Sequence, residues 1–360
     1  MLGLAALTIV AAGLPGCRPP DTAWDFVRRS GTQLTVNGHP WAFAGMNVYN
    51  LNSRGWCWFE MAGTDGLRDA VAASGATVVR GGFFESMVVP AGSGASGQID
   101  WATFDDALAR AHAAGVRVVV TLADQWGACE AGDEKPTSWY ESDYSTVRPG
   151  GYPVDTDVLP LTYREYVAAI VARYKDDPTI LAWQPLNEPQ ACGPTGTTAL
   201  LNFTSDVTSL IKQIDPNHLV SLGTIGGGQC GTANEDYQAL HALPAVDWCE
   251  VHDYGPSGTT LPGDQWNGVA VRFAQCAALG KPLVLGETGI RLDQTPTGSP
   301  TERATAFDEK FDTYRAAGAV GALVWTWADT AHLPDIYGIG PGDPTLAVIA
   351  DHARTWAAGG

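Results

Sequence analysis

Two glutamates, Glu188 and Glu287, stand where they could act as a chemical pair. Each ends an apolar run abruptly, Glu188 in Trp183-Gln184-Pro185-Leu186-Asn187-Glu188-Pro189 and Glu287 in Leu283-Val284-Leu285-Gly286-Glu287. Either one alone could be a solvated loop residue. Two carboxylates about 5–5.5 Å apart can hydrolyse a glycoside with retention. One attacks the anomeric carbon, while the other protonates the leaving oxygen and then activates water.

The elements that must position these glutamates are predicted by alternating apolar runs and amphipathic stretches, a pattern typical of repeated βα units. Eight strands fit a (β/α)₈ TIM barrel in the α/β class, in one domain over residues 26–360. The alternative is a doubly wound sheet, but no GxGxxG motif follows the first strand, which argues against a dinucleotide-binding version. The expected strands are 42–46, 77–80, 116–122, 180–184, 220–225, 248–252, 283–286 and 322–327.

Helices between the strands are predicted by apolar residues at helical spacing. A β-hairpin from residues 26–29 and 33–36, with a second tight turn at Asn37-Gly38, is expected to cover the bottom of the barrel. Active sites of such barrels lie at the carboxyl ends of the strands. The predicted helical faces comprise Phe104, Ala107, Leu108 and Ala111, then Tyr166, Ile170, Val171 and Tyr174, then Phe203, Val207, Leu210, Ile211 and Ile214.

These motifs resemble glycoside hydrolase family 5, within the larger clan of (β/α)₈ retaining glycosidases, over most of the chain after residue 40. Asn187-Glu188-Pro189 is similar to the clan's acid/base motif, and Gly286-Glu287 is similar to its nucleophile motif. The resemblance implies that Glu188 is the acid/base and Glu287 the nucleophile. It also implies that Asn187 contacts the 2-hydroxyl of the sugar in the −1 subsite.

Further strand-end residues match the family. The resemblance implies that Arg80 holds the nucleophile ionised, and a nearby cation does lower a carboxylate pKa; the alternative is a salt bridge at the barrel rim. It also implies that His252 lies near the acid/base and the sugar, rather than being a core histidine, and that Tyr254 donates a hydrogen bond to the nucleophile. Trp325 and Trp327 are expected on one face of the eighth strand and are both expected to contact the substrate, with Trp325 as the floor of the −1 subsite.

The chain has 13 tryptophans, and several fall in predicted loops at the top of the barrel. Aromatic faces pack well against the apolar faces of sugars. Trp126, which follows the third strand, is the expected sugar contact among them, whereas packing within the protein is the alternative for the others. The other loop tryptophans are Trp56, Trp58, Trp139 and Trp266.

The substrate is predicted from two further stretches that resemble the β-mannanase branch of the family. These are Phe43-Ala44-Gly45-Met46-Asn47-Val48-Tyr49 and residues 177–183 before Asn187-Glu188-Pro189. The first expectation is therefore β-1,4-mannan, and a β-1,4-glucanase or an exo-β-glycosidase of the same clan is the alternative. A non-catalytic carbohydrate-binding lipoprotein is a third reading, but it gives no reason for a paired acid and nucleophile.

The charge balance limits the partners. With 39 acidic and 21 basic residues, the formal net charge is −18, which disfavours nucleic acids and anionic membrane surfaces as partners. A neutral polysaccharide or oligosaccharide is easier to accept. No cysteine or histidine spacing indicates a zinc site, so we expect neither a metal nor another cofactor, and we expect a monomer.

The first residues and the cysteines indicate export. Residues 1–16 are interpreted as a signal peptide and 17–25 as a short tether, with Leu14-Pro15-Gly16-Cys17 resembling a lipobox; lipidation at Cys17 and plain secretion both stay open. The six other cysteines favour disulfides, although buried free thiols are the alternative. Of 15 possible pairings, we expect Cys57–Cys129, Cys192–Cys230 and Cys249–Cys276.

Overall fold

The computed structural model describes residues 24–49, 51–52, 63–89, 98–130, 134–147, 159–255, 268–328 and 337–357. Residues 1–16 of the predicted signal peptide and Cys17 with most of the predicted tether lie outside the described residues. So do Cys57, Trp56, Trp58 and Trp266. Within the described ranges, none of the helices combines the length and apolar character needed to span a bilayer.

Eight parallel strands form the centre of the molecule, in the order β8-β7-β6-β5-β4-β11-β10-β9. The two ends of this ladder meet through backbone hydrogen bonds from Asp247 to Val220 (2.8 Å) and from His252 to Ile225 (2.9 Å). The predicted (β/α)₈ barrel is therefore confirmed. The strands are β4 (Phe43–Asn47), β5 (Val78–Gly82), β6 (Arg117–Thr121), β7 (Ile180–Gln184), β8 (Leu219–Val220), β9 (Cys249–Tyr254), β10 (Leu283–Gly289) and β11 (Gly321–Val324).

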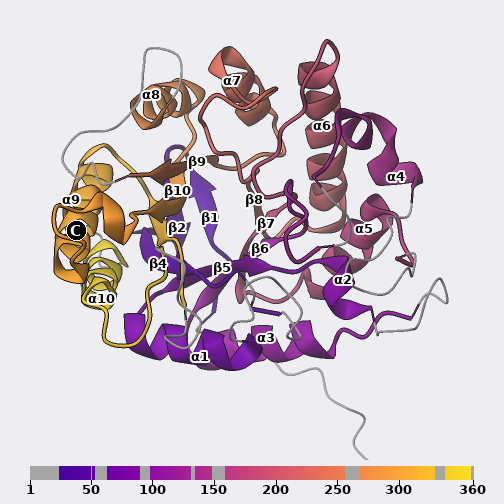
Figure 1. Cartoon of the computed structure of the whole chain (residues 1–360). Coiled ribbons are helices and arrows are strands. Elements are labelled where there is room, and N and C mark those ends of the chain that lie inside the picture. The colour runs from indigo at the N-terminus through magenta and orange to yellow at the C-terminus, as the bar shows by residue number, and fades with distance from the viewer. Residues whose placement is uncertain are drawn as a thin grey trace, which may run out of the picture.

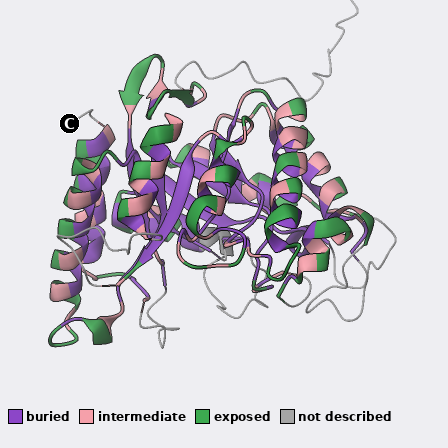
Figure 2. Cartoon of the chain, turned by 90° about the horizontal axis from the view of Figure 1, so that it is seen from above, coloured by how far each residue is buried: buried purple, intermediate pink, exposed green. Residues whose placement is uncertain are grey.

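A ring of helices surrounds the strands (Figure 1). In α3 the buried residues are Phe104, Ala107, Leu108 and Ala111, which are the predicted face. Figure 2 shows the consequence, with buried strands at the centre and helices that expose only their outer sides. The helices are α1 (Gly63–Ser74), α2 (Glu85–Val88), α3 (Ala102–Ala113), α4 (Tyr144–Thr146), α5 (Tyr163–Tyr174), α6 (Gly196–Ile214), α7 (Asn234–Ala242), α8 (Val269–Leu279), α9 (Pro300–Ala316) and α10 (Thr345–Ala357), with a π-helix η2 (Trp139–Asp143) and a 3₁₀ turn η3 (Leu292–Gln294).

A small antiparallel sheet, β1 (Arg28–Ser30), β2 (Gln33–Val36) and β3 (His39–Trp41), precedes the barrel. The predicted hairpin thus gains a third strand, because Asn37 (φ 53°) and Gly38 (φ 78°) form a tight turn with positive φ at both positions. Leu34 is fully buried and packs with inward-facing barrel residues such as Phe43 and Val284. The sheet therefore closes the amino-terminal end of the barrel, opposite the end where the strands lead into the site.

Three strands are shorter than the sequence predicts: the expected strand 116–122 loses one residue at each end, and two others end early. The expected strand 220–225 ends at Val220, and Gly223 (φ 68°) takes a left-handed conformation that interrupts the extended backbone beyond it. The expected strand 322–327 ends at Val324. The strict alternation that would place residues 325 and 327 on one face is lost beyond that point.

The disulfide predictions are confirmed where both cysteines are described. Cys192 is bonded to Cys230 after β7, and Cys249 of β9 is bonded to Cys276 of α8. Cys129 is also disulfide-bonded, and its predicted partner is the undescribed Cys57. Bonds of this kind are typical of proteins from oxidising compartments.

Replacing Leu34 with Ala tests the role of the small sheet. We expect a loss of about 2–5 kcal/mol in the free energy of unfolding, because a fully buried leucine leaves a cavity at the barrel end. Urea unfolding measures this loss. Gln33→Ala, an exposed neighbour on the same strand, should stay within about 0.5 kcal/mol of the parent. Equal effects from the two variants would show that Leu34 does not seal the barrel.

Candidate active site

Strand β9 carries polar residues into the barrel at every second position. Trp248, just before the strand, packs in the interior core, and Glu250, His252 and Tyr254 follow at intervals of two on the same side, as alternation requires. The other face packs on the helices, where Asp253 forms an ion pair with Lys310 of α9 (3.1 Å). The strand thus stacks an apolar layer, a buried carboxylate, an imidazole and a phenol from bottom to top.

The bend that directs Glu287 inward is an irregularity in β10. The pairing of β10 with β9 shifts register between Leu285 and Glu287, and such bulges often redirect a side chain beside an active site. Gly286 also faces inward, since a Cβ there would lie 2.0 Å from a carboxylate oxygen of Glu250. The bulge therefore lets two successive positions point at the barrel axis, and only the second carries a side chain.

Glu188 is held in an uncommon backbone conformation beyond the end of β7. Its φ is 51°, in the left-handed region that non-glycine residues seldom adopt. Its backbone N–H donates to the Gly223 carbonyl (2.8 Å). Its carboxylate accepts from His252 Nδ1 (2.7 Å) and from Trp126 Nε1 (2.6 Å). Backbone strain of this kind collects at functional sites.

Arg80, fully enclosed in the barrel, ties four surrounding side chains together. Its guanidinium donates to Glu287 Oε1 (2.7 Å) and to Asn47 Oδ1 (2.9 Å). The remaining donors reach Gln184 Oε1 (2.8 Å) and Asn187 Oδ1 (2.6 Å). The rim salt bridge considered from the sequence is therefore wrong, because Arg80 is 2% exposed and lies beneath Glu287.

The amide of Asn187 has only one orientation that satisfies its neighbours. Its oxygen accepts from Arg80, and its nitrogen donates to Asp124 Oδ1 (2.8 Å). A flipped amide would place donor against donor and acceptor against acceptor. Asn187 also lines the cavity, where the residue is expected to meet a sugar hydroxyl.

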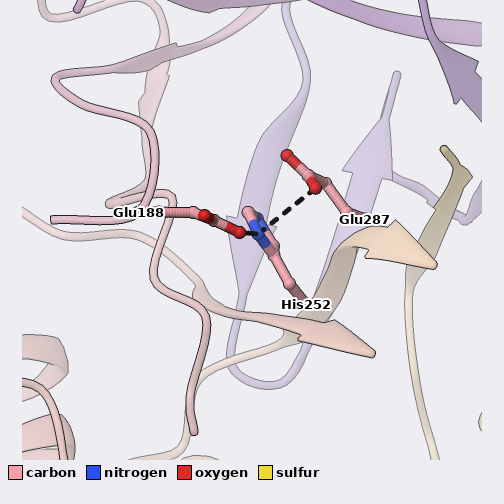
Figure 3. A group of neighbouring side chains, drawn as sticks. All are labelled: Glu188, His252 and Glu287. Carbon is pink, nitrogen blue, oxygen red and sulfur yellow. Dashed lines mark hydrogen bonds and ion pairs between the residues drawn. The ribbon is translucent and has the colours of Figure 1, made fainter. Parts of the chain in front are cut away.

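The two glutamates and His252 form one compact group (Figure 3). One carboxylate oxygen of Glu188, one of Glu287 and a ring nitrogen of His252 all lie within 4.8 Å of one another. This spacing fits the short separation of retaining glycosidases and not the 6.5–9.5 Å of inverting enzymes. Tyr254 donates its hydroxyl to the other oxygen of Glu287. The same atoms could in principle surround a cation, but His252 Nδ1 already shares its proton with Glu188.

The pKa of each carboxylate in the Glu188–Glu287 pair is set by two opposing effects: burial raises it, and nearby positive charges and hydrogen-bond donors lower it. Burial alone raises the pKa of Glu188, but the hydrogen bonds from His252 and Trp126 and the charge of His252 outweigh it, so this pKa is lowered. Burial raises the pKa of Glu287, and the charges of His252 and Arg80 only reduce the rise. Arg80 therefore acts in the predicted direction, but burial is the larger effect.

The His252 ring is the natural place for the shared proton. Burial favours its neutral form, but Glu287, Glu188 and Glu250 overcome burial and raise its pKa to about 9. At neutral pH the proton therefore lies on His252 Nδ1, 2.7 Å from the oxygen of Glu188.

Above the glutamates lies a cavity of about 420 Å³, and half of its ten lining residues are aromatic. Trp325 lines it and stands 5.6 Å from Tyr49, centroid to centroid. Trp327, predicted as a second substrate contact, is 3% exposed and packs in the core; it is not among the residues that line the cavity. The lining residues are Tyr49, Asp124, Trp126, Ala128, Asn187, Glu188, Tyr254, Glu287, Trp325 and Tyr337.

Most predicted site residues converge here, and several others were missed. Trp126 is 43% exposed beside Glu188, as expected for a loop residue that could meet a sugar. Trp139 instead packs against aromatic neighbours such as Phe203 (5.2 Å). Asp124 has no role assigned from the sequence, yet it lines the cavity, where burial raises its pKa to about 7. Only its position at the end of the third barrel strand could have indicated it.

Comparison with known families now defines the class. The model of the family described as Cellulase (glycosyl hydrolase family 5) matches residues 34–331. The chain belongs to glycosyl hydrolase family 5, and it is a glycoside hydrolase. The position of both glutamates at strand ends of a (β/α)₈ barrel agrees with this assignment.

Named relatives are mannan-active enzymes. A mannan endo-1,4-beta-mannosidase A of Hypocrea jecorina is 27% identical, over 91% of this chain and 76% of that protein. A putative mannan endo-1,4-beta-mannosidase 4 of Arabidopsis thaliana is 25% identical, over 91% and 90%. The fold is shared with the endo-1,4-beta-mannanase of Rhizomucor miehei, with a TM-score of 0.68 at 21% identity over 93% of this chain and all of that one.

Tyr254→Phe tests the hydrogen bond to Glu287. A hydrogen bond to a charged group contributes about 1.5–3 kcal/mol, so we expect kcat/KM to fall about 10- to 100-fold on the best substrate. Initial rates of the purified variant measure this. Tyr174→Phe, which removes a hydroxyl bonded to Asp105 (2.7 Å) outside the site, should keep the parent rate. A Tyr254→Phe enzyme of full activity would remove this hydroxyl from the mechanism.

Proposed function

We propose that the chain hydrolyses β-1,4-mannan by double displacement, with Glu287 as nucleophile and Glu188 as acid/base. The observation that carries this proposal is the pair of carboxylates within 4.8 Å of each other, joined through His252 at the carboxyl end of the barrel. In the first step Glu287 bonds to the anomeric carbon while Glu188 protonates the leaving oxygen. In the second step Glu188 takes a proton from water, and the water oxygen displaces Glu287.

The other side chains have matching roles in this proposal. Arg80 and Tyr254 hold the nucleophile in place from below and from the side. Asn187 presents an N–H to the 2-hydroxyl, Trp325 forms the floor of the −1 subsite, and Trp126 contacts the leaving-group side beside Glu188. Each of these groups is fixed by contacts that exist before substrate arrives, which lowers the cost of organising the transition state.

Mannan as the substrate is supported by the names of the relatives, several of which are mannan endo-1,4-beta-mannosidases. A β-1,4-glucanase stays the alternative, because the family model carries the name cellulase and an endoglucanase of Pseudomonas stutzeri shares the fold (TM-score 0.55). An exo-acting enzyme is a further alternative, since a family 5 mannosidase of Rhizomucor miehei shares it too (TM-score 0.65). The binding-lipoprotein reading has no observation in its favour.

Export completes the proposal. The disulfides Cys192–Cys230 and Cys249–Cys276 fit an oxidising compartment. We therefore infer a secreted or lipid-anchored monomer, with a signal peptide over residues 1–16, a tether over 17–25, and one catalytic domain over 26–360. Lipidation would fall on Cys17.

Replacing each glutamate should separate the two roles. Glu188→Ala should lose about 10²–10⁴-fold on mannan, where the leaving oxygen needs a proton, but far less on an activated aryl β-mannoside. Glu287→Ala should lose activity on both, because no leaving group replaces a nucleophile. Initial rates on the two substrates measure this, with circular dichroism to confirm folding. Equal losses of Glu188→Ala on both substrates would contradict the acid role.

A product assay tests the substrate. The purified protein is incubated with β-mannan, galactomannan, glucomannan, carboxymethyl cellulose, mixed-linkage glucan and aryl β-glycosides. We expect short manno-oligosaccharides with the β-anomer formed first, as measured by chromatography and by proton NMR. Products from the glucans alone would establish the glucanase alternative, and single sugars alone the exo-glycosidase. The α-anomer as first product would overturn double displacement.

A further inference from the structure

One buried carboxylate, Glu250, has no part in the mechanism proposed above. It is 1% exposed and points into the barrel one layer below the catalytic group. It accepts two hydrogen bonds from Gln184 Nε2 (2.7 and 2.8 Å) and one from Trp248 Nε1 (3.2 Å). A buried ionised carboxylate costs free energy unless nearby positive charges compensate it. The cations that face Glu250 must therefore be identified.

Two cations face Glu250 from different strands. Arg80 of β5 approaches one carboxylate oxygen with its Nε (3.9 Å), and His252 approaches the same oxygen with its Nε2 (3.6 Å). His252 Nε2 is buried and has no hydrogen-bond partner among the described residues. The ring is therefore placed between two carboxylates, with Glu188 at Nδ1 and Glu250 on the Nε2 side.

The charges of this cluster balance in both steps of the reaction when Glu250 is counted. Arg80 and a protonated His252 supply two positive charges. In the resting site Glu188, whose pKa is lowered, adds a third negative charge; once Glu188 has taken up the proton for the leaving oxygen, the negative charges are those of Glu250 and Glu287, and the sum is zero. In the glycosyl-enzyme, Glu287 is an ester and Glu188 is ionised, and the sum is again zero. Without the charge of Glu250, both states would carry a net positive charge at this depth.

We propose that Glu250 is a positioning residue that keeps His252 in its imidazolium form through both steps of the reaction. The Nδ1–H of His252 then stabilises the Glu188 carboxylate each time Glu188 has given up its proton. The effect on catalysis rests on the proposed function. The protonation of the His252 ring by itself does not. Glu250 is not among the described residues that line the cavity, so it acts through His252 and not by contact with the substrate.

The charged groups that face the His252 ring are three carboxylates, and one guanidinium lies behind them. Glu188 faces the ring from the loop after β7, Glu287 from β10 and Glu250 from β9 itself. Arg80 lies behind Glu287 and Glu250. Removing the negative charge of Glu250 leaves an excess positive charge, so the proton of His252 should leave at lower pH. An opposite charge at this range shifts a pKa by about 1–3.

The experiment is an NMR titration of the histidine rings in Glu250→Gln, which keeps the shape of the side chain and removes its charge. The His252 signal is assigned by its absence in His252→Gln. In the parent we expect a midpoint near pH 9, and in Glu250→Gln a midpoint about 1–3 pH units lower. The alkaline limb of kcat/KM on mannan should move down by the same interval.

Two further variants separate charge from packing. Glu250→Asp changes the fit but keeps the charge, so it should retain the alkaline midpoint of His252. Glu85→Gln removes a buried carboxylate of α2 that accepts from the Leu161 N–H (2.9 Å), and it should leave the midpoint unchanged. A folded Glu250→Gln protein with the parent midpoint would overturn the proposal. If that variant did not fold, a parent midpoint near the ordinary 6.5 of histidine would overturn it equally.

The two proposals fail in distinguishable ways. The titration reports the state of His252 whether or not any glycoside is cleaved. If the protein cleaved no glycoside but the His252 midpoint was high in the parent and lower in Glu250→Gln, the proposed function would be wrong and the role of Glu250 would stand. If the protein cleaved mannan but the His252 midpoint did not move in Glu250→Gln, the role of Glu250 would be wrong and the proposed function would stand.

Discussion

The contact between Arg80 and Glu287 is the interaction on which the rest of the site depends. A buried guanidinium is tolerated only when its donors meet acceptors, and here the acceptors come from three different strands and a loop: Asn47, Gln184, Asn187 and Glu287. The barrel must therefore close with the correct register for Arg80 to be satisfied. The same closure sets Glu287, the proposed nucleophile, in place, so the requirements of folding and of the proposed reaction coincide at one side chain.

Two glycines near the Arg80–Glu287 contact stand where neighbouring groups leave no room for a side chain. Gly286 is required because the Glu250 carboxylate occupies the space of any side chain there. Gly223 is required by its positive φ and by the Leu186 carbonyl, which would lie 2.3 Å from a Cβ. The short β8 that results frees the Gly223 carbonyl to hold the backbone of Glu188. The short strand β8 and the left-handed backbone of Glu188 are thus linked through the Gly223 carbonyl.

The sequence predicts this arrangement where local pattern and topology agree. Strand ends in a (β/α)₈ barrel all lead to one face, so Glu188 and Glu287 could be paired without any knowledge of distance. Trp327 could not be placed, because the strand that was expected to carry it ends at Val324. Glu250 could not be recognised either: alternation with His252 and Tyr254 indicates that it faces inward, but its importance depends on the charges of Arg80 and His252, which tertiary contacts bring to it.

The charge of the cavity walls explains why a neutral polymer suits the site. The walls include Asp124, Glu188 and Glu287, whereas none of the described residues that line the cavity is cationic. Arg80 and His252 lie beneath this surface and are already matched by carboxylates. A polyanionic sugar would meet negative charge without a free cation to receive it, and the net charge of −18 would repel it at longer range. A neutral sugar instead meets aromatic faces and hydrogen-bonding groups. The positive charges of Arg80 and His252 are therefore already paired and are not available to bind an anionic sugar.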